Sequence, residues 1–220
     1  MNTFAADMHS EGRVYIVDDD ESMRRAVRML LRANGYHVES FETANDFFAY
    51  QKEDVPSCVI LDVRLKGHSG LAVQEQFAAM NVTMPIIFMT GYGDIAMSVK
   101  AMKAGALDFL SKPFRDQDML DAVRSALLRD AERREIARCE STLRKCYAAL
   151  SPREREVMEY VAQGLLNKQI ASQLDLTEIT IKIHRAQAMR KMGARSFAEF
   201  VLQARALGIV PDPGKPATQV

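Results

Sequence analysis

The 220-residue sequence predicts an α/β domain built on a doubly wound, five-stranded parallel sheet, followed by an all-α domain of four helices. Up to residue 128, short apolar segments alternate with helical patterns, as in parallel strands joined by right-handed crossovers. From residue 146 onward, apolar residues recur at helical spacing only. The charge balance also changes, from 14 Lys/Arg against 19 Asp/Glu in residues 1–130 to 10 against 7 in residues 151–220. An acidic first part and a basic second part indicate two modules with different partners.

Five segments have the composition of strands in such a sheet. They are short and apolar, the second being the weakest, and lie at residues 13–17, 37–41, 58–61, 85–89 and 107–110. Each is followed by a helical pattern, within residues 23–31, 44–50, 71–80, 95–104 and 116–129. Gly35 and Gly105 stand where two of these helices should end, since glycine is common just after a helix.

The ends of the strands carry the most specific chemistry. Asp18 and Asp19 follow the first strand and Asp62 follows the third, and these two strands are neighbours where a doubly wound sheet reverses direction. Carboxylates gathered there repel one another and need a cation, and oxygen ligands suit Mg²⁺. A carboxylate beside such a metal can attack a phosphoryl group. Thr90 and Lys112 end the fourth and fifth strands, where a hydroxyl donor and a positive charge can bind phosphoryl oxygens.

This set of strand ends resembles the receiver domain of two-component response regulators, a flavodoxin-like fold, over residues 13–128. The resemblance rests on these motifs: Val17-Asp18-Asp19, Leu61-Asp62 with Gly70, Met89-Thr90-Gly91, and Ala104-Gly105-Ala106 through Lys112-Pro113-Phe114. One departure is Lys66-Gly67-His68, which replaces the family's usual Met-Pro-Gly type of loop and puts the rigidity of that loop in doubt.

The resemblance implies a role for each matching residue. Asp62 is expected to be the phosphoacceptor, with Asp18, Asp19, Asp62 and the backbone carbonyl of Arg64 around Mg²⁺. Thr90 and Lys112 are expected to hold the phosphoryl oxygens. Phe109 falls at the aromatic switch position that works with Thr90, and the Lys112–Pro113 bond is expected to be cis.

Residues 129–145 are predicted to form a helical linker. They are mostly charged at first, and then a heptad stripe of apolar residues begins, made up of Ile136, Cys139, Leu143, Cys146 and Leu150. The stripe is out of phase with the apolar residues of the preceding helix, so one unbroken coiled coil is not expected. Two interpretations remain open: the linker pairs with a second copy of the chain, or it docks on its own domain.

The chain has three cysteines, Cys58, Cys139 and Cys146. An odd number without metal-ligand spacing indicates a reducing cytoplasm and no disulfide framework. Cys139 and Cys146 are expected to be small buried hydrophobic residues on one face of a helix. No apolar run approaches the length of a membrane span, so no membrane contact is expected.

Residues 146–208 predict four short helices. Ser151 caps the first and Pro152 occupies its first turn. The second covers residues 167–174, and a three-residue turn separates it from the third, which Thr177 caps and Gly193 ends. The third helix is basic, with an inner face of Ile181, His184, Ala188 and Met192, so it fits the recognition helix of a helix-turn-helix.

This module is similar to the LuxR-type helix-turn-helix, as in response regulators of the FixJ and NarL type, and the whole chain is closest to the FixJ type. The matching residues are Leu150 through Val157, Gly164, Asn167 through Ala171, Thr180-Ile181-Lys182 with His184, and Lys191-Met192. The likeness implies that Lys168, Thr177 and Thr180 touch phosphates and that Lys182 and Ile183 reach base edges. Arg185 and Arg190 are further candidate DNA contacts, because arginine can bind phosphates or read guanine. Ala186 departs from relatives with a lysine there, so the target sequence cannot be transferred.

The sequence therefore predicts a cytoplasmic transcription regulator rather than an enzyme. It is expected to accept a phosphoryl group from a sensor histidine kinase, to form a homodimer on phosphorylation, and to bind double-stranded promoter DNA. The last residues, 209–220, are expected to be disordered.

Two alternative functions share parts of this pattern. A haloacid-dehalogenase-type phosphohydrolase also phosphorylates an aspartate, in an Asp-x-Asp motif that Asp18-x-Asp20 matches superficially. The residues after Asp20 are Glu21 and Ser22, without that motif's Thr/Val, and no acidic metal-binding motif follows a strand beyond Lys112. The other alternative is an orphan receiver that binds DNA without phosphorylation, and the complete set of strand-end residues argues against it.

Overall fold

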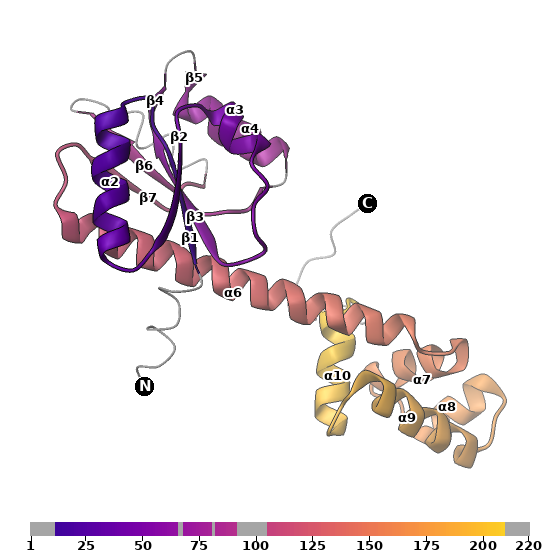
Figure 1. Ribbon diagram of the computed structural model, residues 1–220. Helices are drawn as coiled ribbons and strands as arrows, with labels where there is room; N and C mark the ends of the chain where they lie inside the picture. The colour runs from indigo at the N-terminus through magenta and orange to yellow at the C-terminus, as the bar shows by residue number, and fades with distance from the viewer. Residues whose placement is uncertain (1–11, 66–67, 81, 92–104, 210–220) are drawn as a thin grey trace. The chain divides into compact units, whose positions relative to one another are not determined.

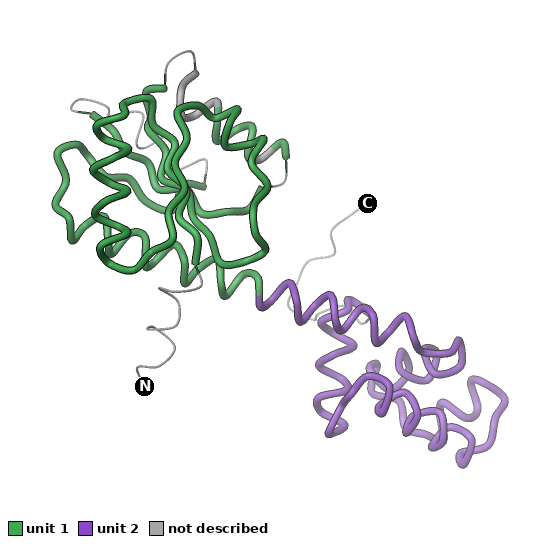
Figure 2. The backbone as a smooth tube through the Cα atoms, in the orientation of Figure 1, with its two compact units in different colours: residues 1–134 green, residues 135–220 purple. Residues whose placement is uncertain are grey.

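The computed structural model describes residues 12–65, 68–80, 82–91 and 105–209, which form two compact units. Unit 1 is Met1–Arg134 and unit 2 is Glu135–Val220 (Figure 2). The predicted helix at residues 95–104, the loop residues Lys66 and Gly67, and the predicted tail from residue 210 lie outside the described residues.

Unit 1 contains the predicted five-stranded parallel sheet, in the order β2-β1-β3-β6-β7 (Figure 1). Its strands are β1 (Arg13–Val17), β2 (His37–Phe41), β3 (Ser57–Asp62), β6 (Ile86–Thr90) and β7 (Asp108–Ser111). β1 pairs with β3 in parallel, as predicted from the doubly wound pattern. A small antiparallel pair was not predicted: β4 (Arg64–Leu65) and β5 (His68–Ser69), directly after the Asp62 strand.

Helices cover both faces of this sheet, because successive strand residues point to opposite sides. Val14 and Ile16 pack with residues of α2 (Glu21–Ala33) and of the first part of α6 (Asp116–Ala148). Tyr15 and Val17 pack on the other side, with residues of α3 (Ala44–Ala49) and α4 (Gly70–Ala79). The central strand β3 is buried along its whole length, so its last residue, Asp62, is carried to the edge of the sheet by an apolar segment.

α6 is one continuous helix of 33 residues, so the last helix of the sheet domain and the predicted linker are not separate elements. Within unit 1, Asp130 of this helix is fully buried and accepts a hydrogen bond from the backbone amide of Ser57 at 2.9 Å. Arg133 donates to Asp130 Oδ1 at 2.7 Å and Arg134 to Oδ2 at 2.6 Å. Arg134 also pairs with Asp54. This charged cluster fixes α6 to the start of β3.

Unit 2 contains four further helices, α7 (Pro152–Ala162), α8 (Asn167–Leu174), α9 (Glu178–Met192) and α10 (Phe197–Ala206). The caps agree with the sequence pattern: Ser151 forms a capping box with Glu154, and Thr177 and Ser196 cap α9 and α10. Gly193 ends α9 with a φ of 70°, a left-handed conformation that glycine adopts without strain.

The heptad stripe is used within unit 2. Leu150 is buried in its core, and Leu143 and Cys146 pack against that core. This favours docking of the helix on its own domain, the second of the two interpretations. The expectation that both cysteines are buried was wrong for Cys139, which is exposed together with Ile136 on the first part of the stripe, and Cys146 is half-buried. Cys58 is fully buried, and this burial, with Asp130 nearby, raises the pKa of its thiol far above the ordinary value.

Candidate functional site

The acidic residues predicted at the strand ends lie together in unit 1. One carboxylate oxygen each of Asp18, Asp19 and Asp62 lies within 4.8 Å of the others. The register of the sheet causes this proximity, because Val17 pairs with Leu61 and the carboxylates follow directly. The three side chains offer only oxygen ligands, and they follow or end two neighbouring strands. Such a set of donors fits Mg²⁺.

Lys112 follows β7 and brings a positive charge to this cluster. Its Nζ lies 3.0 Å from Oδ2 of Asp18 and 3.3 Å from Oδ2 of Asp62. Its backbone amide donates to the carbonyl of Thr90 at 2.6 Å, and the bond to Pro113 is cis, as the family resemblance implied. The hydrogen bond to Thr90 holds the start of the loop after β7, and the lysine side chain points at the two carboxylates.

Asp18 is the most enclosed of the three carboxylates. It is fully buried; Oδ1 accepts from the amide of Asp20 at 2.8 Å, and Oδ2 faces Lys112. The guanidinium of Arg24, on α2, donates to the backbone carbonyl of Asp18 at 2.5 Å. Sequence reasoning missed Arg24, because nothing in a helical pattern singles out one of several arginines. Its position in the turn after the acidic residues is the available signal.

Asp62 is buried to 8% exposure, and its pKa is raised above the ordinary value for an aspartate. Burial is the main cause. Lys112 lowers this pKa, the nearby charge of Asp18 raises it, and a hydrogen bond from the backbone of Arg64 lowers it. The three carboxylates have one lysine beside them, and a bound cation can neutralise their remaining negative charge.

Thr90 and Phe109 lie on the two neighbouring strands at one side of the sheet. Thr90 ends β6 and is buried, and its hydroxyl donates to the carbonyl of Gly91 at 3.3 Å. Phe109 lies on the edge strand β7 and is 41% exposed. The helix predicted at residues 95–104, between these two strands in the sequence, lies outside the described residues.

Asp20, the residue on which the phosphohydrolase alternative depends, is the N-cap of α2. Its side chain caps α2 by accepting from the amides of Ser22 at 2.8 Å and Met23 at 3.3 Å, and it is exposed. The capping carboxylate is therefore not part of the cluster formed by the other three aspartates.

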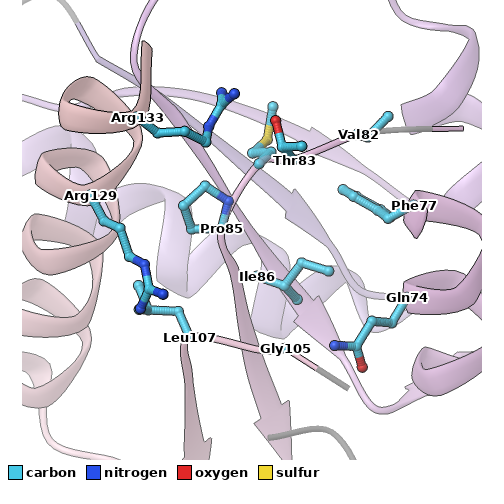
Figure 3. Close-up of a pocket in the computed structure, with 11 residues that line it drawn as sticks. Gln74, Phe77, Val82, Thr83, Pro85, Ile86, Gly105, Leu107, Arg129 and Arg133 are labelled. Carbon is cyan, nitrogen blue, oxygen red and sulfur yellow. The ribbon is translucent and has the colours of Figure 1, made fainter. Parts of the chain in front are cut away.

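A separate hollow of about 410 Å³ lies at the opposite end of β6 (Figure 3). Ile86, at the start of that strand, lines it together with Phe77 and Pro85, and the guanidinium groups of Arg129 and Arg133 stand on the α6 side. The described residues that line this hollow include no carboxylate.

In unit 2, the candidate DNA contacts divide into exposed and enclosed residues. Lys182, Ile183 and Arg190 are exposed on α9, and Lys168 is exposed on α8. Thr177 is exposed at the start of α9, where its hydroxyl accepts from the amide of Thr180 at 3.2 Å and lies 2.9 Å from the hydroxyl of that residue.

Two other basic residues of α9 have partners within the unit. Arg185 is half-buried, donates to Oδ1 of Asn167 at 3.2 Å and stacks over the ring of Phe197 at 5.9 Å. Lys191 pairs with the buried carboxylate of Glu154 at 2.6 Å. The sequence analysis overlooked Ile179, which is 70% exposed on the same face of α9 as Lys182. Helical spacing from Lys182 was the signal that could have identified it.

Two family models match the chain, and each covers one of the sites described above. Residues 14–124 match the response regulator receiver domain, and residues 148–204 match the bacterial regulatory proteins of the luxR family. No helix in the described part of the chain has the length and apolar character needed to cross a membrane.

Similar proteins cover nearly the whole chain. It is 52% identical to Nodulation protein W of Bradyrhizobium diazoefficiens, over 89% of this chain and 86% of that one. It is 44% identical to the response regulator protein TmoT of Ectopseudomonas mendocina, over 87% of each chain. Among solved structures, the response regulator StyR matches with a TM-score of 0.81 and 42% identity, over 89% of this chain and 98% of that one. Full-length FixJ from B. japonicum matches with a TM-score of 0.55 and 36% identity, over 92% and 100%.

Proposed function

The chain belongs to the two-component response regulators that join a receiver domain to a LuxR-type DNA-binding domain, and on this premise we propose that Asp62 is its phosphoacceptor. The protein is a transcription regulator, as the combination of these two domains implies. The phosphoryl group comes from a sensor histidine kinase, phosphorylation promotes dimerisation, and the dimer binds promoter DNA.

One observation carries the proposal for Asp62. Its carboxylate lies next to those of Asp18 and Asp19 and 3.3 Å from the ammonium of Lys112. Phosphoryl transfer needs a nucleophile, a place for a cation and a fixed positive charge, and these groups supply all three. Asp18, Asp19, Asp62 and the backbone carbonyl of Arg64 would hold Mg²⁺, which neutralises charge on phosphoryl oxygens when it is bound.

In the proposed step, an oxygen of Asp62 forms a bond to phosphorus. The bond between phosphorus and the imidazole nitrogen of the kinase's histidine breaks, and its electron pair leaves on the imidazole. Lys112, already between Asp18 and Asp62, would bind one phosphoryl oxygen, and the hydroxyl of Thr90 would donate to another. Asp18, whose oxygens both have partners within the protein, would keep Lys112 in place.

Phosphorylation with a small donor tests this assignment. Acetyl phosphate with Mg²⁺ should label the full-length protein, and the adduct should be acid-stable and hydroxylamine-labile, as an acyl phosphate is. Asp62→Asn should abolish labelling. Asp20→Asn is the matched control, because asparagine also caps a helix, and it should label normally. Equal labelling of Asp62→Asn would reject the site, and loss in Asp20→Asn instead would favour the phosphohydrolase.

The proposed switch runs through Thr90 and Phe109. A phosphoryl group adds negative charge and acceptor oxygens, which would draw the hydroxyl of Thr90 away from the carbonyl of Gly91. Phe109, exposed on the neighbouring edge strand, could then turn toward the vacated space and change the face that β7 presents. Sedimentation with and without beryllofluoride measures the result. A monomer that persists at tens of micromolar while DNA affinity rises would exclude dimerisation as the switch.

For DNA, the exposed residues of α8 and α9 support the proposed contacts. Lys168, Thr177 and Thr180 would bind phosphates, Arg190 would add phosphate attraction, and Lys182 and Ile183 would face base edges in the major groove. Footprinting on genomic fragments, with and without a phosphodonor, tests this part. Protection that never depends on the phosphodonor would support the orphan receiver instead.

A further inference from the structure

The outward face of α9 is more apolar than a basic helix requires. Five residues at i, i+3, i+4, i+7 and i+11 share this face: Ile179, Lys182, Ile183, Ala186 and Arg190. All five are exposed, with Ile179 at 70% and Ile183 at 51%. Three of the five are aliphatic, and the other two, Lys182 and Arg190, are cations.

Folding of unit 2 does not explain these isoleucines. The opposite stripe of α9 supplies the core contacts, through Ile181, Ala188 and Met192, which are all buried. β-Branched residues are also poorer than average on the exposed face of a helix, because they lose side-chain freedom there. Two isoleucines one turn apart on the exposed face therefore do not stabilise the folded unit. Burying them would be favourable only when a binding partner covers this face.

Charge indicates what that surface is. Lys182 and Arg190 lie on the same stripe, and Lys168 is exposed on the neighbouring helix α8, so phosphates are attracted on both sides of the isoleucines. In the major groove of duplex DNA, the apolar group offered to an aliphatic side chain is the C5-methyl of thymine.

We propose that Ile179 and Ile183, extended by Ala186, read thymine methyl groups in the major groove; this inference rests on the proposed DNA-binding function. The two isoleucines are one turn apart, about 6 Å along the helix. Base pairs follow one another at about 3.4 Å, so the thymines read should lie about two base-pair steps apart in each half-site. Lys182, between the isoleucines, is the polar base contact of this face, because Arg185 is held by Asn167 and Phe197.

Removal of single methyl groups from the DNA tests the proposal without altering its charge. The full-length protein, treated with acetyl phosphate and Mg²⁺, first selects its preferred duplex from a randomised pool. Each thymine of that duplex is then replaced by uracil, which lacks only the methyl. We expect a loss of about fourfold in affinity at each position read, the effect of one buried methyl group. Ile179→Ala should remove the sensitivity at one thymine and Ile183→Ala at another, with an unchanged dependence on salt.

Leu202→Ala is the matched control, since Leu202 is a similarly exposed aliphatic residue on α10. It should leave the uracil sensitivities as they are, and the thermal unfolding of all three variants should match that of the parent. If the protein binds its selected duplex but no uracil substitution matters, the inference is wrong while DNA binding stands. If Ile179→Ala lowers self-association and leaves DNA affinity unchanged, the face docks a second copy and the inference is again wrong. Absence of binding to any duplex would overturn the proposed function itself.

Discussion

The two units use charged residues in opposite ways. In unit 1, Lys112 stands between two buried carboxylates and Asp130 is buried among two arginines and a backbone amide. In unit 2, Lys182 and Arg190 project from α9 with no acidic partner among the described ion pairs. Removal of a buried, paired charge such as Asp130 is expected to change stability, whereas removal of an exposed charge such as Lys182 or Arg190 is expected to change binding.

The largest effect should come from the buried charge that the functional sites do not include. Asp130→Ala removes the acceptor shared by two arginines and the Ser57 amide, and it leaves that buried amide without its partner near the sheet. We expect a loss of about 3–5 kcal/mol in the free energy of unfolding of unit 1, measured by urea denaturation. Asp54→Ala is the matched control. Asp54 contacts the same Arg134 but is 97% exposed, and its removal should have no measurable effect. Equal losses in both variants would contradict the role given to burial.

The next prediction compares two lysines of the same helix. Lys182→Ala should weaken binding to the preferred duplex by about 1–3 kcal/mol, more than binding to random DNA, without changing thermal unfolding. Lys191→Ala should instead leave the carboxylate of Glu154 buried without its cation and lower the stability of unit 2 by about 2 kcal/mol. Fluorescence anisotropy with labelled DNA and calorimetric unfolding separate the two effects. If Lys182→Ala binds the preferred duplex as tightly as the parent does, Lys182 does not contact base edges.

The same comparison shows what the sequence can and cannot predict. Strand ends were predictable because each apolar run stops abruptly in a chemical group, and parallel strands bring such ends to one edge. Lys182 and Lys191 differ in the structure because one faces outward and the other reaches Glu154, which lies 37 residues away in the sequence. Asp130 was missed for a similar reason: within a charged stretch it looks solvated, and its partner Ser57 is 73 residues away.

The heptad stripe was ambiguous for a different reason. A spacing of three and four residues places side chains on one face of a helix, but it does not say what covers that face. Leu143, Cys146 and Leu150 are covered by the core of their own unit, while Ile136 and Cys139 remain exposed. The two-residue strands β4 and β5 are too short to leave any periodic signal.

A smaller effect is expected from pH, through the acidic cluster. Burial raises the pKa of Asp62 in the folded protein above its value in the unfolded chain. The folded state therefore binds the proton more tightly, and stability is lost as pH rises from the ordinary aspartate pKa through the raised one. In the presence of a chelator near neutral pH, Asp62→Asn should unfold at a higher temperature than the parent. Mg²⁺ should raise the unfolding temperature of the parent more than that of the variant, measured by differential scanning fluorimetry. If Asp62→Asn is less stable than the parent in the presence of the chelator, burial of the charged Asp62 carboxylate does not destabilise the folded protein.

The smallest effect concerns Arg185 of α9 and tests whether its charge is used within unit 2 or to bind DNA. Arg185 was predicted from the sequence to contact DNA, yet its guanidinium is held by Asn167 and stacks on Phe197. A cation over an exposed aromatic ring contributes about 0.5–1 kcal/mol, so Arg185→Ala should lower the stability of unit 2 by about that amount. Its effect on DNA should be small, because a side chain already bound within the protein must break those contacts to reach a phosphate. The slope of log affinity against log salt separates the possibilities. This slope should be unchanged in Arg185→Ala. In a variant that loses a phosphate contact, such as Lys168→Ala, the slope should become shallower by about one. If the slope becomes equally shallow in both variants, Arg185 leaves Phe197 when DNA binds and is one of the residues that contact DNA.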